Sequence, residues 1–302
     1  MNATAPLGTI AHYNLLERLD PAGPGELFRA RDTRLGRTVA IRLLPSDFVA
    51  DGVSGEAVIE KARGLAALSH PNVTTVFGAG EHEGRTYLVF EFLKGQSLRS
   101  EMAGRPVNVR RAVELAIQIA DAVADAHAAG YVHGGLSPDS IVITAKGHAK
   151  IPVFALASRG GFEPGDGGAR LRDYDSPEEA RGQGADDRSD IYSVGAVLFE
   201  MLTARRPSHR GAAAPSASAP HVIADLDEIV LTAVAPNPDL RYQSAATFAA
   251  ELRAVGAILD ERGGAGDEEQ IASQGTSVGR VAMMAVVILA LVAAVVWWAL
   301  SS

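Results

Sequence analysis

The stretch YVHGGLSPDSIVI, residues 131–143, brings a histidine, an aspartate and two serines together within eight positions. Histidine and aspartate are among the side chains that most often move protons in enzymes. Two glycines follow His133, however, and a glycine offers no base. Asp139 comes directly after a proline, where an aspartate typically stabilises a turn. The spacing therefore predicts an ordered loop that carries few reacting groups.

The remaining composition excludes several kinds of chemistry. There are no cysteines, which excludes disulfides, thiolate metal sites and a thiol nucleophile. The eight histidines show no metal-ligand spacing, so the sequence predicts no histidine-bound metal. The net charge of -8 gives no basic field for a phosphate backbone, and we expect no nucleic-acid binding.

The elements that must position the loop change in character along the chain. Residues 13–93 carry short β-type runs separated by glycine or charged turns, with one helical segment, GEAVIEKARGLAAL, among them. Residues 94–258 are mostly helical by periodicity, most clearly in VRRAVELAIQIADAVADAHAAG. We expect a small β-rich lobe with one helix, followed by a larger helical lobe. Residues 1–12 are predicted to be disordered.

The C-terminal part differs from everything before it. Residues 259–280 are polar and glycine-containing, and they predict a flexible linker. Residues 281–300, VAMMAVVILALVAAVVWWAL, form an uncharged stretch of about 20 residues, the length that spans a hydrocarbon core of ~30 Å. A buried core helix is the alternative, but paired tryptophans at one end favour a membrane helix, and Arg280 before it favours a single-pass protein with residues 1–280 in the cytoplasm. Ala290 and Ala294 have the spacing that could pack two such helices in a homodimer.

Six landmarks occur in an order that resembles bacterial-type serine/threonine protein kinases over about residues 13–258. They are RTVAIRLL, LSHPNV, YLVFEFLKGQSL, YVHGGLSPDSIVI, YDSPEEARGQGADDRSDIYSVGAVLFEML and NPDLRYQSA. The resemblance implies an α+β, two-lobed protein-kinase-like fold, to which the predicted transmembrane helix is added. It also implies ATP as substrate and a set of site residues that can be compared one by one.

Around the nucleotide the chain departs from the family pattern. Of the glycine loop expected at residues 20–25, only Gly25 matches. Arg42 stands where the family has a lysine, and Lys61 stands where it has the helix glutamate, so two cations replace an ion pair. Glu60 is adjacent, but one residue is about 100° around a helix, so it could substitute only after a register shift.

The departures continue in the catalytic region. The resemblance places the family's catalytic aspartate at Gly135, its lysine at Ser137 and its metal-binding asparagine at Ser140. Val153, in Val-Phe-Ala, stands where the second metal ligand is expected, and a valine cannot bind Mg²⁺. Asp139 is the nearest carboxylate that could act as a displaced base.

Residues that the family uses for packing are retained. A remnant adenine pocket is predicted from Leu27, Ala40, Phe90 and Val142. The structural residues of the family match Leu65, His133, Phe154, Glu178, Asp190 and Arg241, and Val76 could extend the stacked interior. Residues 206–225, rich in proline, alanine and serine, are expected to form a loop where the family has a docking helix.

The sequence therefore favours a membrane-anchored pseudokinase, a non-enzyme that acts as a signalling scaffold or allosteric partner. Its predicted partners are cytoplasmic signalling proteins, such as active kinases or their substrates. No metal is expected and no cofactor, although ATP without Mg²⁺ could still bind. The alternatives are a serine/threonine protein kinase and a nucleotide-binding switch, each with unorthodox site chemistry.

Overall fold

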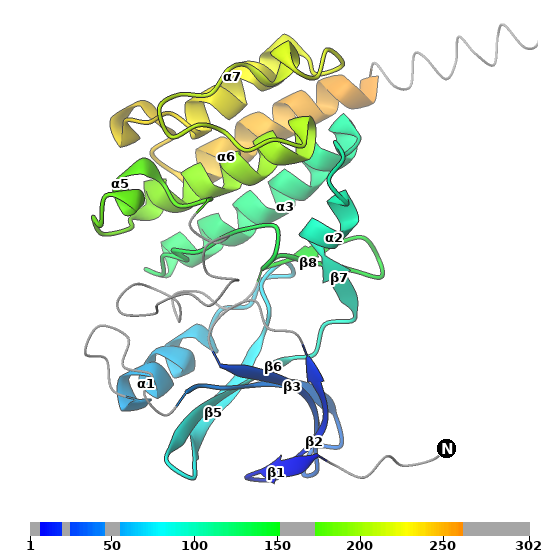
Figure 1. Ribbon diagram of the computed structural model, residues 1–302, viewed down its shortest axis with the longest axis vertical. Coiled ribbons are helices and arrows are strands. Elements are labelled where there is room, and N and C mark those ends of the chain that lie inside the picture. The colour runs from blue at the N-terminus through cyan, green and yellow to red at the C-terminus, as the bar shows by residue number, and fades with distance from the viewer. Residues whose placement is uncertain (1–6, 20–24, 46–54, 152–172, 262–302) are drawn as a thin grey trace, which may run out of the picture. The chain divides into compact units, whose positions relative to one another are not determined.

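The computed structural model describes residues 7–19, 25–45, 55–151 and 173–261. Its N-terminal lobe is a six-stranded antiparallel sheet with strand order β1-β2-β3-β4-β6-β5, and one helix lies beside it (Figure 1). The elements are β1 (Gly8–Ile10), β2 (Tyr13–Leu19), β3 (Glu26–Asp32), β4 (Thr38–Leu43), α1 (Gly55–Leu65), β5 (Val76–His82) and β6 (Arg85–Glu91).

Alternation along the strands gives this sheet two distinct faces. One face carries the hydrophobic core of the lobe, made of Ile10, Tyr13, Leu15, Phe28, Ala30, Val39, Ile41 and Val89. The register pairs Leu27 with Arg42, Arg29 with Ala40 and Ala40 with Phe90, so these residues lie on the opposite face. The sheet therefore buries one face in its own core and turns the other towards the predicted nucleotide site.

The first strand corrects the prediction that residues 1–12 are disordered. Residues 8–10 pair with β2, and the side chain of Ile10 is 3% exposed. A positive φ of 50° at Ala11 turns the chain directly into β2. Burial of one apolar side chain and a tight turn stabilise this strand, and a three-residue run is too short for periodicity to reveal.

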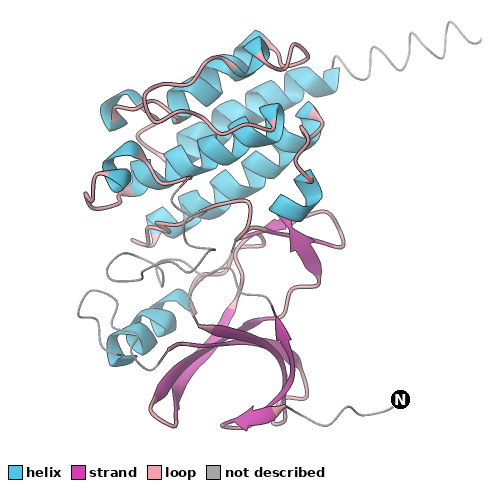
Figure 2. Ribbon diagram, viewed as in Figure 1, coloured by secondary structure: helices cyan, strands magenta, loops and turns pink. Residues whose placement is uncertain are grey.

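The C-terminal lobe is helical apart from a small three-stranded sheet (Figure 2). The elements are β7 (Gly95–Ser97), α2 (Leu98–Met102), α3 (Val109–Ala128), β8 (Val142–Thr144), β9 (Ala149–Lys150), α5 (Pro177–Ala180), α6 (Asp187–Thr203) and α7 (Ala224–Ala233), and residues 245–261 are also helical. Residues 204–223 form a loop with one short 3-10 turn, Pro215–Ala217, as their composition predicts.

Helix α6 is the centre of this lobe, packed against α3 and α7. Every residue from Ser189 to Thr203 is buried, so the helix is covered on all sides rather than along one stripe. Asp186 caps its first turn by accepting hydrogen bonds from the backbone N–H groups of Arg188 and Ser189. Gly195 allows close approach, because a Cβ there would lie 2.7 Å from the Cβ of Ala233.

No helix among the described residues is long and apolar enough to cross a bilayer. Residues 281–300, where the sequence predicts a membrane helix, lie outside the described residues. The membrane helix and the domain limits therefore stay predictions.

The helical lobe contains a buried ion pair between Glu178 and Arg241. The Arg241 side chain is fully buried, and its two terminal nitrogens lie 2.6 and 2.7 Å from the two carboxylate oxygens of Glu178. The guanidinium also donates to the carbonyl oxygens of Ala235 and Arg188. Burial alone would raise the pKa of Glu178, but the hydrogen bonds and charge of Arg241, together with hydrogen bonds from Ser176 and the backbone, outweigh it and lower that pKa to about 2.

We predict that Arg241→Leu lowers the free energy of unfolding by about 3–5 kcal/mol, because it leaves a buried carboxylate without its partner. The control is Arg253→Leu, which removes an exposed pair with Asp121 and should cost less than about 1 kcal/mol. Urea denaturation measures both changes. Equal losses in the two variants would contradict the prediction.

The same pair sets a pH dependence. Because the pKa of Glu178 is lowered on folding, its contribution is complete above the ordinary value of 4.5 and is lost as the pH falls from there towards about 2. The wild-type chain should lose more stability over this interval than Arg241→Leu does.

Candidate nucleotide and catalytic site

The face of the sheet opposite its hydrophobic core brings together three residues of the predicted nucleotide site. Ala40 and Arg42 lie two residues apart on β4, and Leu27 on β3 pairs directly with Arg42. Ala40 is 9% exposed, and Phe90, its partner on β6, is 8% exposed. Arg42 is half-buried, and burial lowers its pKa to about 10. This face therefore presents an apolar surface next to a cation that is largely removed from water.

Helix α1 orients its two adjacent charged residues differently. Glu60 is exposed and pairs with Arg63, with 3.1 Å between the carboxylate oxygen and the guanidinium nitrogen. Lys61 is half-buried beside the buried residues Val58, Ala62 and Leu65, and burial lowers its pKa. Glu60 therefore does not replace the family's helix glutamate. The charged side chain that lies beside the buried residues of α1 is that of Lys61, which is positive.

The carboxylate of Asp190, on α6, binds the backbone of the catalytic loop. It accepts hydrogen bonds from the backbone N–H of His133 at 2.7 Å and of Gly134 at 2.8 Å. The Nε2 of His127, on α3, lies 2.8 Å from the same carboxylate. Gly134 has a φ of +63°, in the left-handed region that glycine adopts without strain. The loop is therefore shaped by backbone contacts to α6.

The reacting positions of this loop carry no carboxylate or amide. A Cβ added to Gly135 would meet no described atom within 4 Å, so there is room for a side chain that the sequence does not supply. The hydroxyl of Ser140 donates to the carbonyl oxygen of Ser137 at 3.0 Å and accepts from the backbone N–H of Ser137 at 3.2 Å. Ser137 is fully buried, and its Oγ has no hydrogen-bond partner among the described residues.

Asp139, the proposed displaced base, belongs to an ion-pair network instead. Its carboxylate lies 3.2 Å from the Nε of Arg99. The Nη1 of Arg99 lies 2.6 Å from Glu200 on α6, and the hydroxyl of Tyr174 contacts both Arg99 and Glu200. Burial and then the hydrogen bond to Glu200 raise the pKa of Tyr174 to about 12. Asp139 is thus neutralised by the chain itself, which argues against its use as a base.

No motif in the sequence predicts this network. Arg99 and Glu200 are 101 positions apart, and neither stands in a motif that the family uses for catalysis. A second contact of this kind joins the two lobes, because the Nζ of Lys150 on β9 lies 2.7 Å from the carboxylate of Glu91 on β6. Charge and exposure reveal such pairs only when the fold is known.

The described members of the predicted structural set are buried. Leu65, Val76 and His133 are each at most 5% exposed, and Asp190 is fully buried. Val142, on β8, is half-buried and pairs with Lys150. Val153 and Phe154 lie outside the described residues, so the second metal-ligand position and one member of the stacked interior stay predictions.

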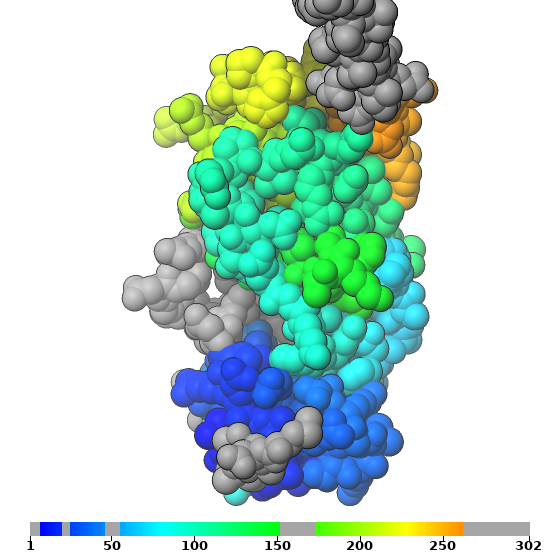
Figure 3. Space-filling model, turned by 90° about the vertical axis from the view of Figure 1, so that its right-hand side faces the viewer, coloured from blue at the N-terminus to red at the C-terminus, as the bar shows by residue number. Residues whose placement is uncertain are grey.

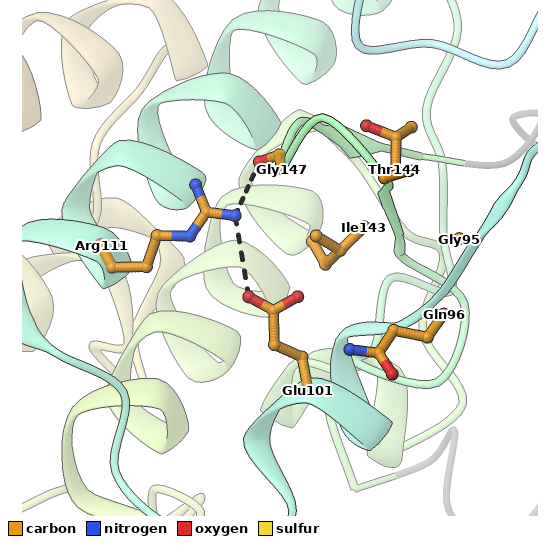
Figure 4. A pocket seen from close by; sticks show the side chains of 8 residues that line it. Gly95, Gln96, Glu101, Arg111, Ile143, Thr144 and Gly147 are labelled. Carbon is orange, nitrogen blue, oxygen red and sulfur yellow. Dashed lines mark hydrogen bonds and ion pairs between the residues drawn. The ribbon is translucent and has the colours of Figure 1, made fainter.

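A shallow hollow of about 500 Å³ lies between the paired strands β7 and β8 and the start of α3. Arg111 spans it by donating to the carbonyl oxygen of Gly147 at 2.6 Å and lying 3.7 Å from Glu101 (Figure 4). Figure 3 shows the face that carries β8, in green, beside the teal surface of α2 and α3. None of the predicted site residues lines this hollow.

Comparison with known families decides what this arrangement is. Residues 13–252 match the model of the protein kinase domain. The chain belongs to the protein kinase domain family. The two-lobed fold that the sequence predicts is confirmed by this match and by the solved structures below.

Several curated relatives are serine/threonine-protein kinases. The chain is 34% identical over 273 residues to PknB of Mycobacterium tuberculosis. The aligned region covers 82% of this chain and 44% of that protein. It is 33% identical over 269 residues to a probable serine/threonine-protein kinase of Streptomyces coelicolor, covering 80% of this chain and 39% of that protein. The chain thus spans less than half the length of these two relatives.

Solved structures show the same fold at lower identity. The kinase domain of PknI from Mycobacterium tuberculosis superposes with a TM-score of 0.68 and 23% identity, covering 83% of this chain and 99% of that chain. At this identity the likeness supports the fold alone.

These relatives correct two predictions. The expectation of a non-enzyme is contradicted, because the relatives are named as kinases and so as catalysts. The expectation of no cofactor is contradicted as well, because protein kinases act on ATP together with Mg²⁺. Both expectations came from weighing single site positions, whereas similarity over about 80% of the chain points to an enzyme of this family.

The described side chains nevertheless do not fit a divalent cation. Among the described residues, no three histidine, aspartate or glutamate side chains gather in a way that could hold a metal. The Ser140 hydroxyl is engaged with the loop backbone, and Mg²⁺ prefers several hard oxygen ligands. No step of the chemistry is therefore derived through a metal.

We predict that Gly135→Asp folds with unchanged stability, because a Cβ there meets no atom of the described residues within 4 Å and the glycine φ is not positive. A carboxylate at this position should raise the rate of phosphoryl transfer by about 10²-fold or more, as general bases do. A radiolabelled-phosphate assay measures the rate. Gly135→Asn is the matched control, with the same size and no base.

The contradicting result is an equal rate in both variants, or loss of folding in Gly135→Asp. Gly195→Ala provides the contrast for folding, because its Cβ would clash with Ala233 and should destabilise the chain.

Proposed function

We propose that this chain is a serine/threonine protein kinase with unorthodox site chemistry, one that binds ATP through an apolar pocket and Arg42 and transfers phosphate slowly. Its protein substrates would be cytoplasmic signalling proteins. A nucleotide-binding switch without turnover is the second candidate, and the same pocket favours it. The family membership and the named kinase relatives support the first.

One observation carries the proposal. The register of β3, β4 and β6 places Leu27, Ala40, Arg42 and Phe90 on one face of the sheet. Apolar side chains suit the faces of an adenine ring. A guanidinium suits phosphate oxygens, to which it can donate two parallel hydrogen bonds. Because two residues of a strand span about 7 Å, Ala40 and Arg42 can serve the base and the phosphates of one nucleotide.

The lack of a base lowers the rate of phosphoryl transfer but does not change the type of reaction. In phosphoryl transfer the transition state is loose, and catalysis rests mainly on positioning and charge. A positioned base typically contributes 10²–10⁴-fold. Asp139 and Glu60 are both held in ion pairs, so neither supplies this contribution. Transfer that relies on positioning alone is therefore expected to be slow.

We also propose that the chain is anchored in a membrane by residues 281–300, with the kinase domain in the cytoplasm. The length and the absence of charge in this stretch support the anchor. A homodimer through Ala290 and Ala294 would follow from the small residues at that spacing.

Arg42→Gln should weaken ATP binding about tenfold or more, because it removes charge-assisted hydrogen bonds to phosphate. Isothermal titration of the full-length chain with ATP, with and without Mg²⁺, measures this change. Arg31→Gln is the matched control, since Arg31 is exposed on β3 and lies at the far end of the strand from Leu27. Its affinity should change less than about twofold.

The outcome separates the candidates. ATP binding with phosphate transfer to a serine/threonine peptide supports the kinase, and binding without transfer supports the switch. No heat of binding in the wild-type chain, or equal affinity in both variants, would refute the proposal.

The anchor has its own test. Replacing Ile288 and Leu291 by arginine should move the full-length chain from the membrane pellet to the supernatant, since each charge at the centre of a span costs about 2.5–3.5 kcal/mol. Ser273→Arg, in the predicted linker, should leave the chain in the pellet. Membrane fractionation after carbonate washing decides between them, and a pellet in both cases would contradict the anchor.

A further inference from the structure

A basic hollow opens beside the segment that precedes α5. Its volume is about 470 Å³, and it is lined by Asp173, Arg206, Pro207, Ser208, His209 and Arg210. Five of these residues belong to the loop that follows α6, where residues 205–210 read RRPSHR. This local excess of positive charge contrasts with the chain's net charge of -8.

Two side chains of the basic hollow, Arg206 and His209, are held in place by contacts with aromatic rings. The guanidinium of Arg206 pairs with Asp173 and lies 5.6 Å from the ring centroid of Tyr174. The ring of His209 meets the edge of Tyr192, with centroids 6.0 Å apart. Pro207 is buried, and the Oγ of Ser208 accepts a hydrogen bond from the backbone N–H of Arg210 at 3.2 Å. A pre-ordered site loses less entropy on binding.

The nearby carboxylates do not cancel this charge. Glu200 and Asp139 are engaged by Arg99, and Glu178 is engaged by Arg241. Within the lining, two arginines face one aspartate, which leaves one positive charge with His209 neutral.

Contacts connect the basic hollow to the catalytic loop. Arg206 lies against the Tyr174 ring, the Tyr174 hydroxyl contacts Arg99, and Arg99 pairs with Asp139 in the loop. Two side chains, those of Tyr174 and Arg99, thus lie between Arg206 of the basic hollow and Asp139 of the catalytic loop.

We propose that the basic hollow binds an acidic side chain of the protein substrate, either a carboxylate or a phosphate, close to the residue that is phosphorylated. This inference names the substrate class of the proposed kinase and rests on that function. Arg210 supplies a guanidinium group, which binds carboxylate and phosphate through paired hydrogen bonds. Arg206, already paired with Asp173, adds positive charge beside it. Because Arg99 already occupies Asp139 and Glu200, a basic substrate would find no uncommitted carboxylate in this network.

The test measures peptide binding by the full-length chain, using fluorescence anisotropy. Three labelled peptides share one serine-containing sequence and differ at flanking positions, which carry glutamate, phosphoserine or glutamine. The glutamate and phosphoserine peptides should bind at least about tenfold more tightly than the glutamine peptide. The stronger of the two acidic peptides identifies whether carboxylate or phosphate is the preferred group.

Two arginines of the same loop provide matched variants. Arg210→Glu should remove the preference for the acidic peptides, because Arg210 lines the basic hollow. Arg205→Glu makes the same change of charge at an exposed arginine that does not line it, and should keep the preference. Equal losses in both variants would show general charge attraction and overturn the proposal, as would equal binding of all three peptides by the wild-type chain.

ATP titration of the same samples separates this inference from the proposed function. If the chain binds ATP but binds all three peptides equally, the proposal for the basic hollow is overturned and the proposed kinase function is not. If the chain does not bind ATP but prefers the acidic peptides, and Arg210→Glu removes that preference, the kinase is refuted and the basic hollow is supported as a peptide-binding site.

Discussion

The carboxylate of Asp190 is the contact on which the catalytic region depends. From the buried helix α6 it holds two successive backbone N–H groups, those of His133 and Gly134, and the ring of His127. Its full burial makes these hydrogen bonds costly to lose, because an unsatisfied buried charge is expensive. The loop is therefore fixed to the core of the helical lobe by its main chain. Side chains that point away from Asp190 can change without changing the loop.

Periodicity predicted what depends on neighbours along the chain. The alternation of β4 is enough to place Ala40 and Arg42 on one face, and the register confirms it. The 100° step of a helix is enough to separate Glu60 from Lys61, and the structure turns Glu60 to solvent and Lys61 inward. The landmark order predicted both lobes, because each landmark belongs to one element of the fold.

Contacts between distant segments could not be predicted in this way. Arg99 meets Asp139, Tyr174 and Glu200 only because α2, the catalytic loop, the segment before α5 and helix α6 converge. The sequence predicted Asp139 as the nearest carboxylate, but it could not show that an arginine 40 residues earlier pairs with it. The strand β1 was missed for a related reason, since its stability comes from pairing with β2.

The positions of the family pattern therefore differ in what a substitution there costs the protein. Glu178 and Arg241 are buried together, so losing either would cost folding stability, and both are present. Gly135 borders open space and Ser140 closes a turn with Ser137, so replacing the family's side chains there costs chemistry and leaves the fold intact. Because the loop backbone is held by Asp190 rather than by the reacting side chains, the geometry of a kinase site persists around a missing base. What this geometry still offers to a reaction is position and positive charge, and in phosphoryl transfer these are the larger part of catalysis.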